Sequence, residues 1–186
     1  MSAKDSQATY GFVTKVLHWS IAILVILQFV WIYWRDSLPK GHHLKTWLLL
    51  SLHKPLGMLV LFLGLLFIAW RLINIQPGMP GHTARWELIA ARSVQGFLFL
   101  MMLAMPISGY LMSAASGYSV KWFGLAFPLL IEKNRSLAGL YHDSHHYLGY
   151  FLMACFVLHA AAALKHHFMD RDHLLRRMLP FADPRP

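Results

Sequence analysis

Four long stretches of apolar residues alternate with short polar segments along the 186-residue chain. Each stretch has few charged residues and is long enough for a helix to cross a bilayer. The segments between them include runs rich in proline and glycine, which are typical of connections. The expected spans are residues 12–34, 47–72, 87–115 and 141–165. The pattern predicts an all-α membrane protein built as a four-helix transmembrane bundle.

Little of the chain lies outside these spans, so the sequence predicts a single transmembrane domain over residues 1–186. The first span is expected to be retained, because no cleavage site of small residues follows it. The apolar segment 122–131 is too short to span and is expected to lie in the interface. The basic tail, residues 166–186, is amphipathic near its start and is expected to lie along the cytoplasmic surface.

Composition agrees with a membrane protein, because 57% of the residues are hydrophobic and 13% are charged. The charged share is about half that of a typical soluble domain. The net charge is +9, but the basic residues flank apolar spans, so we expect contacts with lipid headgroups and no nucleic-acid partner. The single cysteine, Cys155, lies in mid-span and is expected to be a packing residue.

The distribution of basic residues predicts the orientation in the membrane. Four spans place both termini on one side, which carries ten Lys and Arg residues against seven on the other. The more basic side is expected to be cytoplasmic. The seven outer bases are Arg35, Lys40, Lys45, Lys54, Lys121, Lys133 and Arg135.

Four histidines lie within the expected spans at two depths. His145 and His159 are 14 residues apart on the last span, which places them on nearly one face and roughly 21 Å apart along a helix. Antiparallel spans place His18 at the depth of His159 and His53 at the depth of His145. A histidine in hydrocarbon is costly without a partner, which makes each a functional candidate. A structural histidine bonded to a backbone carbonyl is the alternative.

Two histidines on facing helices can hold one metal from opposite sides. Zinc would require four ligands, with more thiolate or carboxylate than these pairs supply. Haem requires only two axial ligands, and its apolar ring suits the core of a bundle. We therefore expect the pairs His18/His159 and His53/His145 to ligate two haem irons. Bis-histidine ligation leaves no open iron position and favours electron transfer.

Other residues near these levels have weaker assignments. Gly57 and Gly149 each follow a histidine by four residues and are expected to give the haem ring clearance; close helix packing is the alternative. Lys54 and Lys165 are expected to pair with haem propionates or to extend to headgroups. The remaining histidines considered are expected to be solvated or interfacial: His42, His43, His82, His166, His167 and His173.

Five segments together resemble the bacterial cytochrome b561 family, which is similar to the membrane cytochrome b subunits of nickel hydrogenases. They are VLHWSIAILVILQF (16–29), LHKPLGMLVLFLGLLFIAWRL (52–72), MPISGYL (105–111), WFGLAFP (122–128) and HHYLGYFLMACFVLHAAAALKHHF (145–168). The resemblance implies two b haems, ligated by His18, His53, His145 and His159, in the bacterial inner membrane. The chain departs from the family pattern at Gln95, where a histidine is frequent, and at His146, where a glutamate is frequent.

The resemblance also implies quinone-linked electron transfer. The leading hypothesis is a diheme b-type cytochrome that moves electrons between a periplasmic-side donor and membrane ubiquinone. Some family members oxidise superoxide, which the outer bases would attract; no residue is assigned a catalytic role. One alternative is a haem subunit that passes electrons to or from a partner dehydrogenase or hydrogenase. A second is a haem-free channel or transporter, which the lack of carboxylates deep in the spans disfavours.

Overall fold

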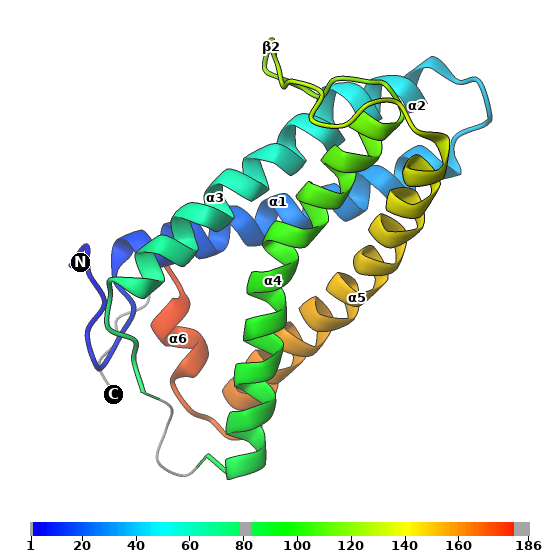
Figure 1. Cartoon of the computed structure of the whole chain (residues 1–186). Helices are drawn as coiled ribbons and strands as arrows, with labels where there is room; N and C mark the ends of the chain where they lie inside the picture. The colour runs from blue at the N-terminus through cyan, green and yellow to red at the C-terminus, as the bar shows by residue number, and fades with distance from the viewer. Residues whose placement is uncertain (1, 79–82, 181–186) are drawn as a thin grey trace. The chain divides into compact units, whose positions relative to one another are not determined.

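The structure is a computed structural model that describes residues 2–78 and 83–180. Helices make up most of it, and one short hairpin is present in the described part (Figure 1). In chain order the elements are α1 (Phe12–Ser37), α2 (His43–Trp47), the π-helical turn η1 (Leu48–His53), α3 (Lys54–Leu72), α4 (Arg85–Ala115), β1 (Lys121–Trp122), β2 (Leu125–Ala126), α5 (Arg135–Phe168) and α6 (Leu174–Met178).

Within the described residues, four helical stretches are long and apolar enough to cross a membrane: Phe12–Ser37, His43–Leu72, Arg85–Ala115 and Arg135–Phe168. Their most apolar windows have mean hydropathies of 1.8 to 2.0. Large apolar side chains such as Leu65, Phe97 and Val157 are exposed. Such side chains are stable against lipid tails, which are as apolar as they are. The all-α class with four membrane-spanning helices, expected from the sequence, is confirmed.

The last spanning helix begins earlier than the apolar pattern indicated. α5 starts at Arg135, six residues before the expected start at residue 141. Asn134 explains the difference, because its Oδ1 accepts the Leu137 N–H at 3.1 Å. An asparagine in this position caps the first turn by satisfying a backbone donor that has no partner in the helix. The backbone N–H of Asn134 also donates to the Ala115 carbonyl at the end of α4.

The second span contains a π-helical turn just before a proline. Pro55 has no N–H, and its ring would collide with the carbonyl four residues earlier in a regular α-helix. The preceding turn widens instead, so the Lys54 N–H bonds to the Leu49 carbonyl. The π-helical turn η1 therefore accommodates Pro55 within a continuous helical span. His53 is the last residue of η1.

The segment expected at the interface contains a hairpin that the sequence did not reveal. β1 and β2 pair antiparallel, with Lys121 opposite Ala126 and Trp122 opposite Leu125. The two turn residues, Phe123 and Gly124, have φ values of 46° and 95°. Positive φ at both turn residues matches the right-handed twist of a two-residue hairpin.

Contacts divide the chain into two compact units, and each of the four long helices contributes a segment to both. Unit 1 comprises Met1–Ser20, Leu65–Met101 and Phe151–Pro186. Unit 2 comprises Ile21–Gly64 and Met102–Tyr150. His18 and His159 therefore belong to unit 1, whereas His53 and His145 belong to unit 2.

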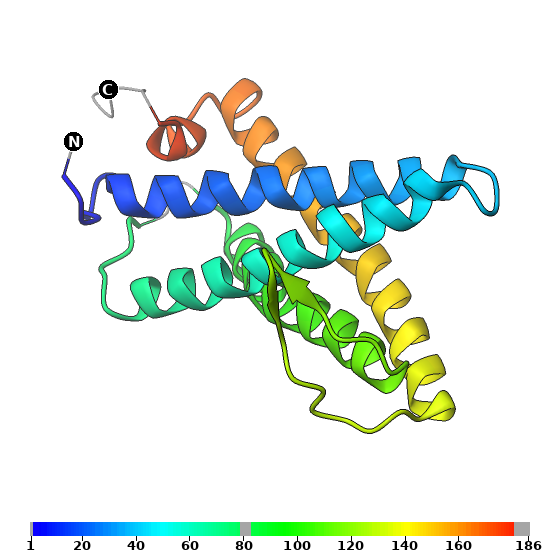
Figure 2. The same ribbon diagram turned by 90° about the horizontal axis from the view of Figure 1, so that it is seen from above.

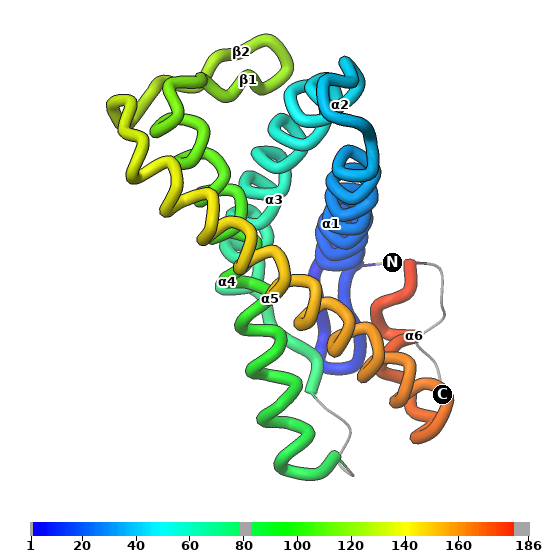
Figure 3. Tube along the Cα trace, turned by 90° about the vertical axis from the view of Figure 1, so that its right-hand side faces the viewer, coloured from blue at the N-terminus to red at the C-terminus, as the bar shows by residue number. Residues whose placement is uncertain are grey.

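In unit 1, the described part of the tail is held against the start of α1. α6 lies beside the first turns of α1 (Figure 2, Figure 3). The Trp19 Nε1–H donates to the Met178 carbonyl, and the Lys15 ammonium donates to the Leu179 carbonyl, each at 2.9 Å. These bonds satisfy carbonyls that the end of a helix leaves without backbone partners.

Candidate functional site

In unit 2, the structure brings the rings of His53 and His145 together. His53 ends η1 and His145 lies in the first half of α5. The ring centroids are 6.1 Å apart, and the ring planes are nearly perpendicular at 89°. These two histidines were expected at one depth from the order and direction of the spans. Their role as ligands stays a prediction.

The orientation of the His145 ring follows from its contacts with α4. Its Nδ1 lies 3.1 Å from the Met105 carbonyl oxygen and 3.0 Å from the Ser108 hydroxyl. Ser108 in turn donates to the same carbonyl at 2.8 Å. A carbonyl can only accept, so Nδ1 of His145 carries the proton. The lone pair of Nε2 is then free for a metal, which is the usual state of a ligating histidine with an outer hydrogen-bond partner.

Gly109 allows the close approach of His145 to α4. A Cβ built on Gly109 would lie 2.9 Å from Cε1 and 3.3 Å from Nδ1 of His145. Contacts this short are essentially never tolerated, so any side chain here would displace the ring. Neither Ser108 nor Gly109 was among the site residues expected from the sequence. The one local indication of this contact was a serine and a glycine side by side in an apolar helix.

The two glycines expected to give ring clearance lie in different surroundings. A Cβ on Gly57 would meet the amide nitrogen of Gln28 at 3.3 Å, and one on Gly149 would meet Cε of Met105 at 3.7 Å. The nearest contacts are therefore with Gln28 and Met105. Clearance of a haem ring at either glycine stays a prediction.

His53 has an open polar atom that His145 lacks. Its Nδ1 is buried and has no hydrogen-bond partner within the described residues. Its backbone carbonyl accepts the Gln28 side-chain N–H at 2.9 Å, while the Oε1 of Gln28 is also buried without a partner there. Buried polar atoms are almost always paired in native proteins, so both atoms can accept a partner from outside the described residues.

In unit 1, His18 and His159 form the second pair. Their ring centroids are also 6.1 Å apart, with the planes inclined at 57°. The Trp19 ring meets the His18 ring edge-on at 5.5 Å. Because the Trp19 N–H is bonded to the Met178 carbonyl, this contact links the surroundings of His18 to the last residue of α6.

The spacing of both pairs fits two axial ligands of one metal. A ligating imidazole nitrogen lies roughly 2 Å from its metal, so two rings on opposite sides have centres about 6 Å apart. In the described part of the chain, neither pair belongs to a cluster of three or more metal-ligand side chains. Each pair supplies only two ligand nitrogens in apolar surroundings. It therefore suits an apolar group whose own atoms provide the remaining metal ligands. Haem is such a group, and the residues present fit it.

His166 was expected to be solvated or interfacial, and the structure shows that it is not solvated. It is buried, and its Nδ1 lies 2.7 Å from Asp172 and 3.1 Å from Asp170. Lys165 joins the same cluster, with its ammonium 2.9 Å from Asp170 and 2.7 Å from Glu87. These are hydrogen-bonding distances that join the end of α5 to the start of α4 within unit 1. His82 lies outside the described residues.

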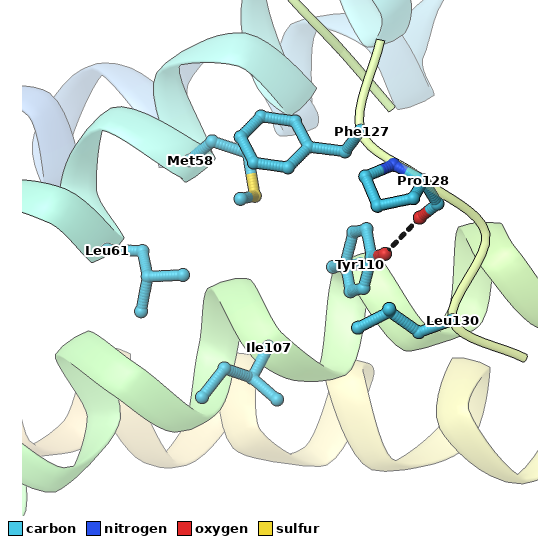
Figure 4. Close-up of a pocket in the computed structure, with 7 residues that line it drawn as sticks. All are labelled: Met58, Leu61, Ile107, Tyr110, Phe127, Pro128 and Leu130. Carbon is cyan, nitrogen blue, oxygen red and sulfur yellow. Dashed lines mark hydrogen bonds between the residues drawn. The ribbon is translucent and has the colours of Figure 1, made fainter. Parts of the chain in front are cut away.

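An apolar pocket of about 190 Å³ lies in unit 2, lined by α3, α4 and the segment after β2 (Figure 4). Figure 4 shows the Tyr110 hydroxyl directed at the Pro128 carbonyl, to which it donates a hydrogen bond. Since this hydroxyl is already engaged, the wall suits an apolar group. The lining residues are Met58, Leu61, Ile107, Tyr110, Phe127, Pro128 and Leu130.

Comparisons with known proteins identify the family of this chain. A sequence model for the family described as prokaryotic cytochrome b561 matches residues 9–181. Cytochrome b561 homolog 2 of Escherichia coli (strain K12) is 33% identical over 183 residues, which cover 96% of this chain and 95% of the relative. Cytochrome b561 homolog 1 of the same organism is 31% identical over 170 residues, with coverages of 88% and 93%.

A third relative carries a more specific name. The probable superoxide oxidase CybB of Yersinia pestis is 29% identical over 167 residues, with coverages of 88% of this chain and 92% of the relative. The family model covers nearly the whole chain, and two relatives exceed 30% identity over most of their length. With four spanning helices and paired intramembrane histidines, this chain belongs to the prokaryotic cytochrome b561 family.

Proposed function

We propose that the chain is a diheme b-type cytochrome that moves electrons between a donor at the periplasmic face and the membrane quinone pool. Family membership already implies a membrane electron carrier with b-type haem. The number of haems, the four ligands and the quinone are the proposed parts. In this proposal the chain acts as one transmembrane domain in the bacterial inner membrane, with both termini in the cytoplasm.

The single observation that carries the proposal is the equal spacing of the two histidine pairs. His18/His159 and His53/His145 have the same centroid separation of 6.1 Å. Each pair combines one residue of α5 with one from an earlier span. One structural histidine bonded to a carbonyl would be unremarkable in a membrane helix. Two pairs with the spacing of axial ligands favour two haems over two unrelated packing contacts.

The chain's own residues supply ligation, orientation and a dry environment. His18 with His159, and His53 with His145, would each hold one haem, which would leave its iron no free position for oxygen. The Met105 carbonyl and the Ser108 hydroxyl hold the proton on Nδ1 of His145 and so present Nε2. Apolar helix faces exclude water and thereby influence the potential of the bound group. Haem itself supplies reversible one-electron transfer when bound.

Superoxide is the donor that we favour. One relative is named a probable superoxide oxidase. The expected outer side carries seven bases, and its acidic residues are Asp36, Glu132 and Asp143. Arg35 is paired with Asp36 at 2.6 Å, so the excess positive charge is on the other outer bases. Such an excess raises the local concentration of a small anion.

The test is superoxide-dependent reduction of a short-chain ubiquinone by the purified, haem-loaded protein. Two superoxide anions would give two molecules of oxygen, while one quinone takes up two electrons and two protons to give the quinol. We expect quinol formation to require the protein and to be lost in His53→Ala. The exposed residue His43 offers a matched control, because His43→Ala should retain the rate.

Charge reversal tests the role of the outer bases separately. Lys121→Glu should slow the reaction and weaken its dependence on salt, because the anion is no longer attracted as strongly. Quinol formation no faster than without protein would contradict superoxide as the donor. Co-purification with a dehydrogenase that reduces the haems would then favour the haem-subunit alternative.

A further inference from the structure

A second kind of histidine pair lies on the exposed side of α5. His142 and His146 are four residues apart, and their ring centroids are 4.7 Å from each other at an interplanar angle of 69°. Both residues are exposed. Residues four apart on a helix are neighbours on one face. The spacing of this pair is shorter than that of the two buried pairs, so it suits a different coordination geometry.

The distance matches two ligands at adjacent positions of one metal. With metal–nitrogen bonds of roughly 2 Å at right angles, two imidazole rings have centres about 4.5 Å apart. Rings on opposite sides of the metal would be about 6 Å apart. His142 and His146 therefore approach a chelating arrangement, and their sequence spacing is the one by which helices of zinc proteases present two histidines.

Asp143 provides the outer partner that such a site requires. Its Oδ1 lies 3.2 Å from Nδ1 of His142. The carboxylate accepts the Nδ1–H of His142, which leaves Nε2 to face a metal. A carboxylate behind a ligating histidine fixes the ring and raises its basicity. The contact is exposed on both sides, so it orients the ring without burying charge.

We propose that His142 and His146 form a binding site for a divalent cation of the copper, nickel and zinc class. Two imidazoles with water at the remaining positions suit these ions, with Cu²⁺ bound most tightly. Calcium and magnesium prefer six or more oxygen ligands and are excluded by this donor set. The site is independent of the proposed haem ligands, although His146 directly follows His145 in the chain.

The chain contains a matched pair that lacks the required geometry. The rings of His42 and His43 are 4.9 Å apart but nearly parallel, with an interplanar angle of 20°. The lone pair of an imidazole nitrogen lies in the ring plane, so stacked rings direct their lone pairs along parallel lines. His42 and His43 therefore do not converge on one metal, although they are equally close and exposed.

The experiment is a Cu²⁺ titration of the haem-loaded protein, purified without a polyhistidine tag. Bound copper is counted per chain after equilibrium dialysis, and electron paramagnetic resonance reports its nitrogen ligands. We expect one Cu²⁺ to bind per chain with a Kd below about 100 µM. Excess Zn²⁺ should displace the bound Cu²⁺. His142→Ala and His146→Ala should each weaken binding at least about tenfold, whereas His43→Ala should not.

Far-UV circular dichroism of each variant shows whether the fold is intact, whether or not haem is bound. Unchanged copper affinity in His142→Ala or His146→Ala would overturn the proposal. Absence of copper binding at about 100 µM would do the same. Copper stoichiometry is measured independently of electron transfer, so failure of the proposed cytochrome function would leave this result interpretable.

Discussion

Nδ1 of His145 lies 3.1 Å from the Met105 carbonyl oxygen, and the Ser108 hydroxyl bonds to both. This three-residue contact fixes which nitrogen of His145 carries the proton. It connects a polar motif of α4 to a candidate haem ligand of α5. Ser108 therefore has a tertiary contact, because its hydroxyl lies at hydrogen-bonding distance from the His145 ring of α5.

Removal of the Ser108 hydroxyl should weaken the proposed bond between His145 and the haem iron without breaking it. In Ser108→Ala, His145 keeps its bond to Met105 but loses a partner that raises the basicity of the ring. We expect both haems to be retained and the midpoint potential of one to rise. The lost hydrogen bond to His145 should cost about 1 kcal/mol. A potentiometric titration followed by absorbance measures the change.

Ser113 gives a matched control for this substitution. It is buried in the same helix, and its hydroxyl has no partner within the described residues. Ser113→Ala should therefore leave both potentials unchanged. Equal shifts in the two variants would show that the effect of Ser108→Ala is general to the helix and not due to His145.

A methyl group at Gly109 should displace the His145 ring. The Cβ would lie 2.9 Å from Cε1 of His145, so Gly109→Ala should lower the haem content of the purified protein toward one per chain. Gly96 is the control in the same helix, because a Cβ there has no neighbour within 4 Å. Gly96→Ala should keep the haem content and add up to about 1 kcal/mol of helix stability. Full haem content in Gly109→Ala would contradict the close packing of Gly109 and His145.

Substitution of one proposed histidine ligand should remove only the haem held by that histidine pair. His159→Ala should remove the haem held with His18, and His53→Ala should remove the haem held with His145, because each iron keeps a single axial ligand. Haem counts and low-temperature spectra distinguish the two losses. If His159→Ala kept both haems, or if either variant lost both in a folded protein, the pairing would be wrong.

The buried contact of His166 with Asp172 should stabilise the end of α5. The side chains are 11% and 5% exposed, so Asp172→Asn should cost about 2 kcal/mol, as expected for a hydrogen bond to a charged group. Thermal unfolding measures the loss. The exposed pair of His142 and Asp143, at 58% and 72% exposure, is the control, and Asp143→Asn should change stability by less than about 1 kcal/mol. A larger effect for Asp143→Asn would refute this account of the tail.

The sequence predicted the parts of the structure that depend on the chain's own periodicity. Apolar length gave the four spans, and span direction grouped His18 with His159 and His53 with His145. The structure places the same residues side by side, although their ligation is untested. These predictions required only the helical repeat and the alternation of direction across the membrane.

Features that depend on tertiary contacts were not predictable in this way. Gly109 was missed because its role lies in the approach of His145, 36 residues later in the chain. The burial of His166 depends on Asp172, which the chain reaches only after α5 ends.

The hairpin was missed because its turn, Phe123–Gly124, lacks the Asn or Asp that usually signals one. The early start of α5 had a recognisable cap at Asn134, but the helix after it begins with Arg135 and Ser136, before the long apolar run.

The most direct test of the central claim is a reduced-minus-oxidised absorbance spectrum of the purified protein, with haem counted per chain. Two histidine pairs with the spacing of axial ligands predict two low-spin b haems per chain. One haem would mean that one pair is a structural contact. A folded protein without haem would contradict the assignment of both pairs and favour a haem-free role for the histidines.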